Sequence, residues 1–407
     1  MKQRIEADLL IPGRGDPVPD GAVEFEGGVI TYAGPAGSPE PEALRVPVVM
    51  PGLWDCHAHF IGVRSLDLSR MPQEPIALRA ARAAARDLGA ALDAGVTSVR
   101  EVGGQGVYLA RAVAEGSALG PNIYAAGAVL STTGGHGDLH GYPLNWMMDY
   151  GHTAVTELRL CDGPSECAKA AREQLRRDAK LIKVCASGGV LSEVDHPIHQ
   201  QFTLAELRAI VEVAGMAERV VAAHCHGKPG ILAALEAGCK TIEHGTYLDE
   251  ECAAAMREKG AILVPTRTII AEILESKAAP PYAQAKLEAL ADQHTSAVEL
   301  AHRSGVTIAM GTDISLTGPL TPASWGRNGR EPALMAECGL SPLAAIEAAT
   351  ATGPETLGPQ APRSGQLKQG YDADLLVLDA NPLEDLGVLA DPSRITQVWL
   401  SGRRVKG

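Results

Sequence analysis

The feature that most limits the fold is a pattern repeated between residues 48 and 313. Short runs rich in β-branched residues end in polar or glycine-rich clusters, and Ala/Leu/Glu-rich stretches with helical spacing follow most of them. Eight runs fit this description: 48–50, 97–102, 123–129, 181–186, 220–223, 241–242, 261–264 and 306–310. Eight strands that alternate with helices predict an α/β protein built on a closed (β/α)8 TIM barrel. A doubly wound sheet is disfavoured, since no GxGxxG motif follows the first run.

Helices are expected at 76–94, 167–178, 204–217, 230–237, 249–259 and 285–304. The third of these begins with a capping box formed by Thr203 and Glu206.

The two ends of the chain have a different pattern, with short strand-like runs and turn glycines. Neither end alone has enough strands to enclose a core. We therefore expect one small β-sandwich that takes strands from both termini, residues 1–50 and 360–407, beside a metal-binding barrel at 51–359.

The charge balance excludes several classes of partner. The 407 residues include 49 acids and 36 bases, a net charge of −13, which argues against binding to nucleic acid or to anionic membranes. The first eight residues lack the apolar core of a signal peptide, and no run is long enough for a membrane helix. The eight cysteines form no CxxC pair, so they are expected to be free thiols in a cytoplasmic protein.

Histidines and one aspartate stand where predicted strands end. His57 and His59 are two residues apart just after the first run. Three later runs also end in a residue that could bind metal, namely His224, His244 and Asp313. Side chains at i and i+2 of a strand share one face, and the carboxyl ends of barrel strands meet at one mouth. The sequence therefore predicts a metal site there, because imidazole and carboxylate are good ligands for first-row metals.

Lys183 is unusual because it lies within an apolar predicted strand. A buried lysine is costly unless its charge is paired or removed. Two interpretations stay open: an ion pair with a nearby acid, or carbamylation by carbon dioxide to give an anionic ligand that bridges two metals.

Together these motifs resemble the metal-dependent amidohydrolase superfamily over essentially the whole chain. The resemblance is strongest to the branch of Xaa-Pro dipeptidases (prolidase-like), imidazolonepropionase-like carboxypeptidases and ochratoxin-type amidases. The motifs that carry it are PGLWDCHAH (51–59), GGHGD (134–138), IK (182–183) with SGGV (187–190), AHCHG (223–227), IEHG (242–245), GTD (311–313), AAT (348–350) and GYDADL (370–375).

The resemblance implies two divalent metal ions. His57, His59 and Asp313 would hold the more buried ion and His224 and His244 the other, with carbamylated Lys183 bridging both. Zinc is the expected metal, although manganese or cobalt would also suit mixed nitrogen and oxygen ligands.

Several residues around these ligands are candidates for the substrate site. His226 would face the substrate, and His136 would form a hydrogen bond with the substrate or the developing oxyanion. Arg267 follows the seventh run and is either a solvated rim residue or the partner of a substrate carboxylate. Glu101 stands where relatives commonly have Asp. His294 and His302 lie in a helical stretch and are expected at the surface.

The expected activity is hydrolysis of an amide bond, with Asp313 acting both as a ligand and as the general base. The preferred substrate is a dipeptide or N-acyl amino acid with a free carboxylate. The alternatives are another cyclic or aryl amide, deamination and, from a different class, a non-catalytic barrel scaffold. The sequence leaves open whether the chain forms a homo-oligomer.

Overall fold

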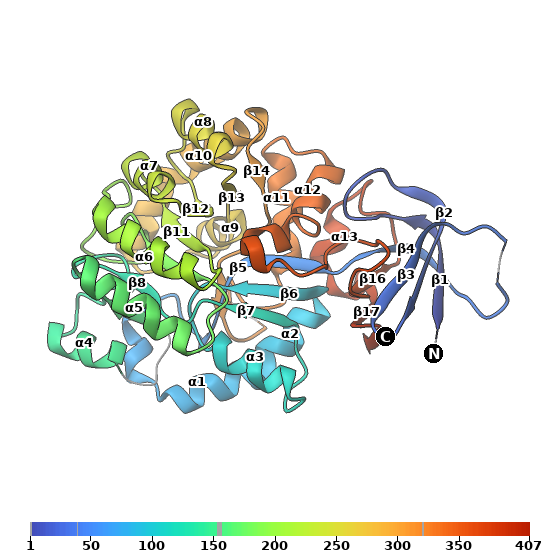
Figure 1. Ribbon diagram of the computed structural model, residues 1–407, viewed down its shortest axis with the longest axis horizontal. Helices are drawn as coiled ribbons and strands as arrows, with labels where there is room; N and C mark the ends of the chain where they lie inside the picture. The colour runs from blue at the N-terminus through green and yellow to red at the C-terminus, as the bar shows by residue number, and fades with distance from the viewer. Residues whose placement is uncertain (1, 39, 153–156, 320) are drawn as a thin grey trace.

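The computed structural model describes residues 2–38, 40–152, 157–319 and 321–407. A barrel of parallel strands surrounded by helices occupies most of the molecule, and a mixed β-sheet stands against one end of it with both chain termini (Figure 1). No helix among the described residues is both long and apolar enough to cross a membrane. The predicted fold class, a TIM barrel with a small β-sandwich domain built from both termini, is confirmed, and the strands of the terminal domain form one mixed sheet.

The barrel consists of parallel strands in two hydrogen-bonded groups, β15-β5-β6-β7 and β14-β13-β12-β11-β10-β8-β9. The Cys56 N–H donates to the Met310 carbonyl at 2.9 Å and joins the first strand to the end of the last. The third strand is interrupted between β7 and β8. The strands are β5 (Leu53–Val63), β6 (Val96–Glu101), β7 (Asn122–Ala125), β8 (Val129–Ser131), β9 (Leu158–Leu160), β10 (Ile182–Cys185), β11 (Val221–Cys225), β12 (Thr241–His244), β13 (Ile262–Val264), β14 (Thr307–Ile308) and β15 (Ile314–Leu316).

Helices are present at the six predicted places, one of them divided, and the structure adds α3, α4, α9, α11, α12 and α13. The expected helix at 76–94 is divided into α1 and α2 by a π-helical turn, Ala83–Asp87. The Thr203–Glu206 capping box is confirmed at the start of α6. The α-helices are α1 (Ile76–Arg82), α2 (Leu88–Asp93), α3 (Gly106–Ala114), α4 (Leu144–His152), α5 (Pro164–Arg176), α6 (Leu204–Met216), α7 (Lys228–Ala237), α8 (Glu250–Lys259), α9 (Arg267–Ser276), α10 (Pro281–Arg303), α11 (Glu331–Glu337), α12 (Pro342–Ala348) and α13 (Gly387–Ala390).

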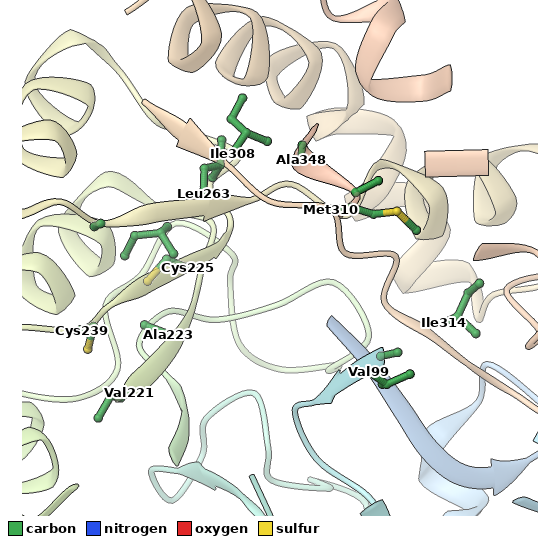
Figure 2. Close-up of a cluster of buried hydrophobic side chains, with 14 of the residues drawn as sticks. Val99, Val221, Ala223, Cys225, Cys239, Leu263, Ile308, Met310, Ile314 and Ala348 are labelled. Carbon is green, nitrogen blue, oxygen red and sulfur yellow. The ribbon is translucent and has the colours of Figure 1, made fainter. Parts of the chain in front are cut away.

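Alternation along the strands separates the packed outer layer from the barrel interior. On β11, Val221, Ala223 and Cys225 belong to the apolar cluster between strands and helices, as Figure 2 shows. The residues between them, Ala222 and His224, point the other way because successive strand side chains face opposite sides. A strand with a fully apolar outer face can therefore present a histidine to the interior.

The terminal sheet has seven strands in the order β18-β17-β16-β4-β1-β2-β3, and β1 and β4 form its parallel pair. It curls until β3 meets the segment before β16, where the Ile30 N–H donates to the Tyr371 carbonyl at 2.8 Å. The strands are β1 (Gln3–Leu10), β2 (Val18–Glu26), β3 (Val29–Pro35), β4 (Leu44–Pro51), β16 (Leu375–Leu378), β17 (Ile395–Leu400) and β18 (Arg403–Lys406).

One strand assignment from the sequence is wrong. Residues 48–50 were expected to be the first barrel strand, but they lie in β4 of the terminal sheet, and the barrel begins with β5 at Leu53. Gly52 alone separates the two strands, so a continuous β-type sequence crosses from one sheet to the other. The predicted limits between the two domains stay a prediction for the same reason.

Candidate metal centre

His57 and His59 both lie on β5 and project into the barrel. The pairing of β5 with β6 shifts register between Asp55 and Ala58, and beyond this shift Ala58 packs in the outer cluster. The Nδ1–H of His59 donates to the Gly103 carbonyl at 2.7 Å, and that of His57 donates to Glu243 Oε2 at the same distance. With both Nδ1 atoms bound in this way, each Nε2 is left for the barrel centre.

Asp313 approaches the same point from the loop after β14. Its Oδ1 lies 3.1 Å from His59 Nε2 and 3.5 Å from His57 Nε2. Burial would raise the pKa of Asp313, but the two adjacent histidines outweigh burial and lower it to about 2. The side chain is therefore a carboxylate at neutral pH. Its backbone has a positive φ of 59°, a strained conformation of the kind found at functional sites.

His224, His226 and His244 form the other side of the centre. The ring centroids of His224 and His244 are 4.6 Å apart, and those of His226 and His244 are 4.8 Å apart. Burial, together with the neighbouring histidines, lowers the pKa of each well below its ordinary value. Neutral imidazoles keep a lone pair, which is the form that binds metal.

Hydrogen bonds orient these three rings. The His224 Nε2–H donates to the Gly188 carbonyl at 3.0 Å, which leaves Nδ1 as its ligand atom. His226 Nδ1 is 2.7 Å from Thr246 Oγ1, and His244 Nδ1 is 2.7 Å from Thr266 Oγ1.

The predicted ligands are brought together. Ligand atoms of His57, His244 and Asp313 lie within 4.8 Å of one another, and so do those of His224, His226 and His244. Two overlapping groups of buried nitrogen and oxygen donors suit two adjacent divalent ions. His226, expected to face the substrate, is part of the second group.

Lys183 lies between the two groups, on β10. Its side chain is buried, and its Nζ is 3.4 Å from His57 Nε2. Burial lowers the pKa of this amine, and no carboxylate forms an ion pair with it among the described residues. A lysine amine whose pKa is lowered by burial, beside the candidate metal ligands, fits the expected carbamate, since carbon dioxide reacts with the neutral form of an amine.

Buried charges behind the ligands were missed from the sequence. Glu243 is fully buried and accepts hydrogen bonds from His57 and from Arg100 Nη2, the latter at 2.7 and 2.8 Å. Asp55 accepts from the Thr312 hydroxyl at 2.6 Å and so fixes the turn before Asp313. The available signal was a charged residue within a strand, as with Asp55 on β5, Arg100 on β6 and Glu243 on β12.

Glu101, the noted departure, ends β6. Its Oε1 accepts from the backbone N–H groups of Phe60 and Gly106 at 3.3 and 3.2 Å. Burial raises the pKa of Glu101 to about 7. These contacts hold the turn that contains Gly103, whose carbonyl orients His59.

His136 lies in a glycine-rich loop, and its ring stacks on that of His224 with centroids 4.3 Å apart. Burial lowers the pKa of His136. The ring lines two adjoining cavities above the metal ligands. The first cavity has apolar walls that come from many parts of the chain: Ile61, Leu68, Met71, Val129, Leu139, Leu158, Leu191 and Ile269.

Arg267 is not among the described residues that line these cavities. Its Nη1 is 3.0 Å from His294 Nδ1, and its backbone N–H, at the start of α9, donates to Glu331, the first residue of α11. Its binding of a substrate carboxylate stays a prediction. The expected surface position of His294 is wrong: its side chain is fully buried and contacts Arg267, whereas His302 is partly exposed.

Comparisons with known proteins agree with this geometry. A family model for the amidohydrolase family matches residues 48–405. The ochratoxinase of Aspergillus niger is 42% identical over 423 residues, which cover 99% of this chain and 86% of that protein. Its crystal structure superposes with a TM-score of 0.92 over 100% of this chain and 96% of that one. A prolidase in complex with N-methylphosphonate-L-proline has 33% identity and a TM-score of 0.90, with both chains fully covered. The predicted resemblance is therefore confirmed: this chain belongs to the amidohydrolase family and is a metal-dependent hydrolase that acts on C–N bonds.

Proposed function

We propose that this chain is a binuclear hydrolase of amides with a bulky, apolar or aromatic acyl group, similar in substrate class to ochratoxinase. This is the alternative that the sequence left open, and it replaces the dipeptide as the preferred substrate. The observation that carries it is the lining of the cavity above the metal ligands.

That lining is apolar on most sides, from Ile61 on β5 round to Ile269 on α9. Neither cavity has a lysine or arginine among its described lining residues. An aromatic acyl group would bury apolar surface there, at about 25 cal/mol per Å² removed from water.

We assign the ligands as the resemblance implies. His57, His59 and Asp313 would hold one ion, His224 and His244 the second, and a carbamate on Lys183 would bridge them. Two divalent ions at this centre, zinc by preference, would supply Lewis acidity toward the amide carbonyl and a water of lowered pKa.

Asp313 has the chemistry of a proton acceptor in this site. Its carboxylate is ionised at neutral pH, since the pKa is lowered to about 2, and Oδ1 faces His57 and His59 at the centre. We assign Asp313 Oδ1 to accept a proton from the attacking water and to return it to the leaving amine.

A prolidase-like activity is the second candidate, and the likeness to the prolidase structure favours it. The two candidates differ in what occupies the apolar cavity. An Xaa-Pro dipeptide would leave much of that surface in contact with water unless the first residue is large.

The test is hydrolysis of a substrate panel by zinc-loaded protein. The panel contains ochratoxin, synthetic aryl amides with and without a free carboxylate beside the scissile bond, and a set of Xaa-Pro dipeptides. The expected result is a higher kcat/KM for the aryl amides and ochratoxin than for any dipeptide. Asp313→Asn serves as the control for catalysis at this centre. Hydrolysis of dipeptides alone would overturn the proposal and support the second candidate.

A further inference from the structure

A chain of hydrogen bonds leads away from His136 into the loop after β10. His136 Nδ1 is 2.8 Å from Ser192 Oγ, and the Ser192 hydroxyl also contacts Asp195 Oδ1. Asp195 Oδ2 accepts from the Gly189 N–H at 2.9 Å and from Gln201 Nε2 at 3.0 Å. Four groups of one loop thus support a single imidazole in the cavity wall.

The loop itself is fixed in place. Lys286, on α10, donates through Nζ to the backbone carbonyls of Ser192 and Asp195 at 2.7 and 2.5 Å. Gly189 packs directly under the His136 ring, where a Cβ would lie 2.1 Å from ring atoms. The close packing leaves the ring no room to tilt toward the loop.

The direction of each hydrogen bond follows from the chemistry of the groups. Asp195 is a carboxylate that only accepts, because the N–H groups of Gly189 and Gln201 face its Oδ2 and the ammonium of Lys286 lies 3.7 Å from its Oδ1. The Ser192 hydroxyl has one proton and donates it to Asp195 at the shorter contact. Ser192 Oγ must then accept from His136, so Nδ1 carries the ring proton.

We infer that Ser192 and Asp195 are positioning residues that hold His136 as the Nδ1–H tautomer, with the Nε2 lone pair toward the cavity. The inference rests on the proposed function only for its substrate. Of the two roles expected from the sequence, it keeps the hydrogen bond with the substrate and excludes the one with the oxyanion, because an imidazole that presents a lone pair accepts a hydrogen bond and cannot donate one.

The substrate group that such an acceptor recognises is an N–H. A secondary amide, R–CO–NH–R′, carries one on the leaving nitrogen, whereas an ester or a prolyl amide has none. We therefore assign His136 to recognise the N–H of a secondary amide.

Asp195→Asn gives a sharp test because the surroundings dictate how the new amide must lie. Two N–H donors, from Gly189 and Gln201, face the Oδ2 position, so the amide oxygen stays there and the NH₂ group faces Ser192. Gln201 cannot turn round without cost, since its Oε1 accepts the His136 backbone N–H at 3.0 Å. Ser192 would then accept from Asn and donate to His136 Nδ1, which moves the ring proton to Nε2.

The measurement is a long-range ¹H–¹⁵N correlation spectrum of zinc-loaded protein labelled at the histidine ring nitrogens. The His136 signals are identified by their absence in His136→Gln. In the native protein we expect a proton on Nδ1 and none on Nε2. In Asp195→Asn the proton should be on Nε2 instead. The control Glu193→Gln, which changes an exposed acid of the same loop, should give the native pattern. A native spectrum with a proton on Nε2 overturns the inference, even if the variants fail to fold.

Kinetics test the substrate assignment separately. Asp195→Asn should lower kcat/KM roughly tenfold for a secondary amide, the order expected for one hydrogen bond. It should spare the ester with the same acyl group, and Glu193→Gln should behave as the native protein does on both. Equal losses on amide and ester would overturn the recognition of the N–H. If only dipeptides are hydrolysed but the tautomer is as expected, the proposed function fails and the positioning role stands.

Discussion

Replacing Glu243 by glutamine should lower both the stability of the barrel and its affinity for metal. Glu243 and Arg100 are both fully buried, and the carboxylate also accepts the Nδ1–H of His57. In Glu243→Gln the buried guanidinium loses its counter-charge, and the new NH₂ group must face either Arg100 or the imidazole N–H, which are themselves donors. Breaking a buried ion pair on one side costs about 3–5 kcal/mol, a large share of the roughly 5–15 kcal/mol that stabilises a typical domain.

The metal should be affected by a second route. His57 loses the carboxylate that orients its ring and raises its basicity, and loss of such an outer partner typically lowers metal affinity about 10–100-fold. The assays are urea unfolding of metal-free protein and competition of zinc-loaded protein with a chelator. Glu258→Gln, an exposed change on α8, is the matched control and should alter neither quantity.

A double variant distinguishes the two effects. Arg100→Met with Glu243→Met removes both charges, and apolar replacement of a buried ion pair is often neutral for stability. The double variant should therefore recover most of the lost free energy of unfolding but not the metal affinity. If the single variant unfolds at the same urea concentration as the native protein and binds zinc with the same affinity, the reasoning about this pair is refuted.

Four further predictions follow from the site and its surroundings. Lys183→Ala should lose bound metal in elemental analysis, and full metal content would remove Lys183 from the ligand set. Asp313→Asn should lower kcat about 10²–10⁴-fold with a smaller loss of metal, because the other ligands remain; near-normal turnover would exclude it as the proton acceptor. Arg267→Ala should affect free-acid and amide-blocked substrates equally, because Arg267 contacts His294 and does not line the described cavities; a loss confined to free acids would return it to the substrate site. Burial raises the pKa of Asp374 from 3.8 to about 7, so the folded chain keeps a proton that the unfolded chain has released; stability should fall between pH 4 and 7 by up to about 1.4 kcal/mol per pH unit, and urea unfolding of Asp374→Asn should lack this slope.

The barrel and the meeting of the candidate ligands at its centre could be predicted because their signals are local. A histidine or aspartate at the end of an apolar run is visible within a few residues, and the barrel topology brings such ends together. Alternation alone, however, would have directed His244 outward, since Ile242 packs in the outer cluster. A positive φ of 68° at His244 turns its side chain back to the centre, and no sequence rule for a strand predicts that conformation.

The errors have equally physical causes. Residues 48–50 have the composition of a barrel strand, and Gly52 alone separates their strand, β4, from β5. The pattern of residue types therefore does not distinguish a strand of the terminal sheet from a strand of the barrel. His294 has a helical position typical of a surface residue, but tertiary packing, which includes the contact with Arg267, buries it. Neither the sheet to which residues 48–50 belong nor the burial of His294 is determined by the nearby sequence.

The substrate cavity could not be predicted from the sequence for a different reason. Metal ligands stand out because a polar side chain inside a strand is costly and so needs a purpose. The apolar cavity walls are leucine, isoleucine, valine and methionine from strands, helices and loops, and these residues look the same whether they cover a core or a ligand. The sequence therefore predicted the polar residues that the strands carry to the barrel centre. The choice of substrate depends on which apolar side chains remain uncovered, and that is settled only when the loops meet.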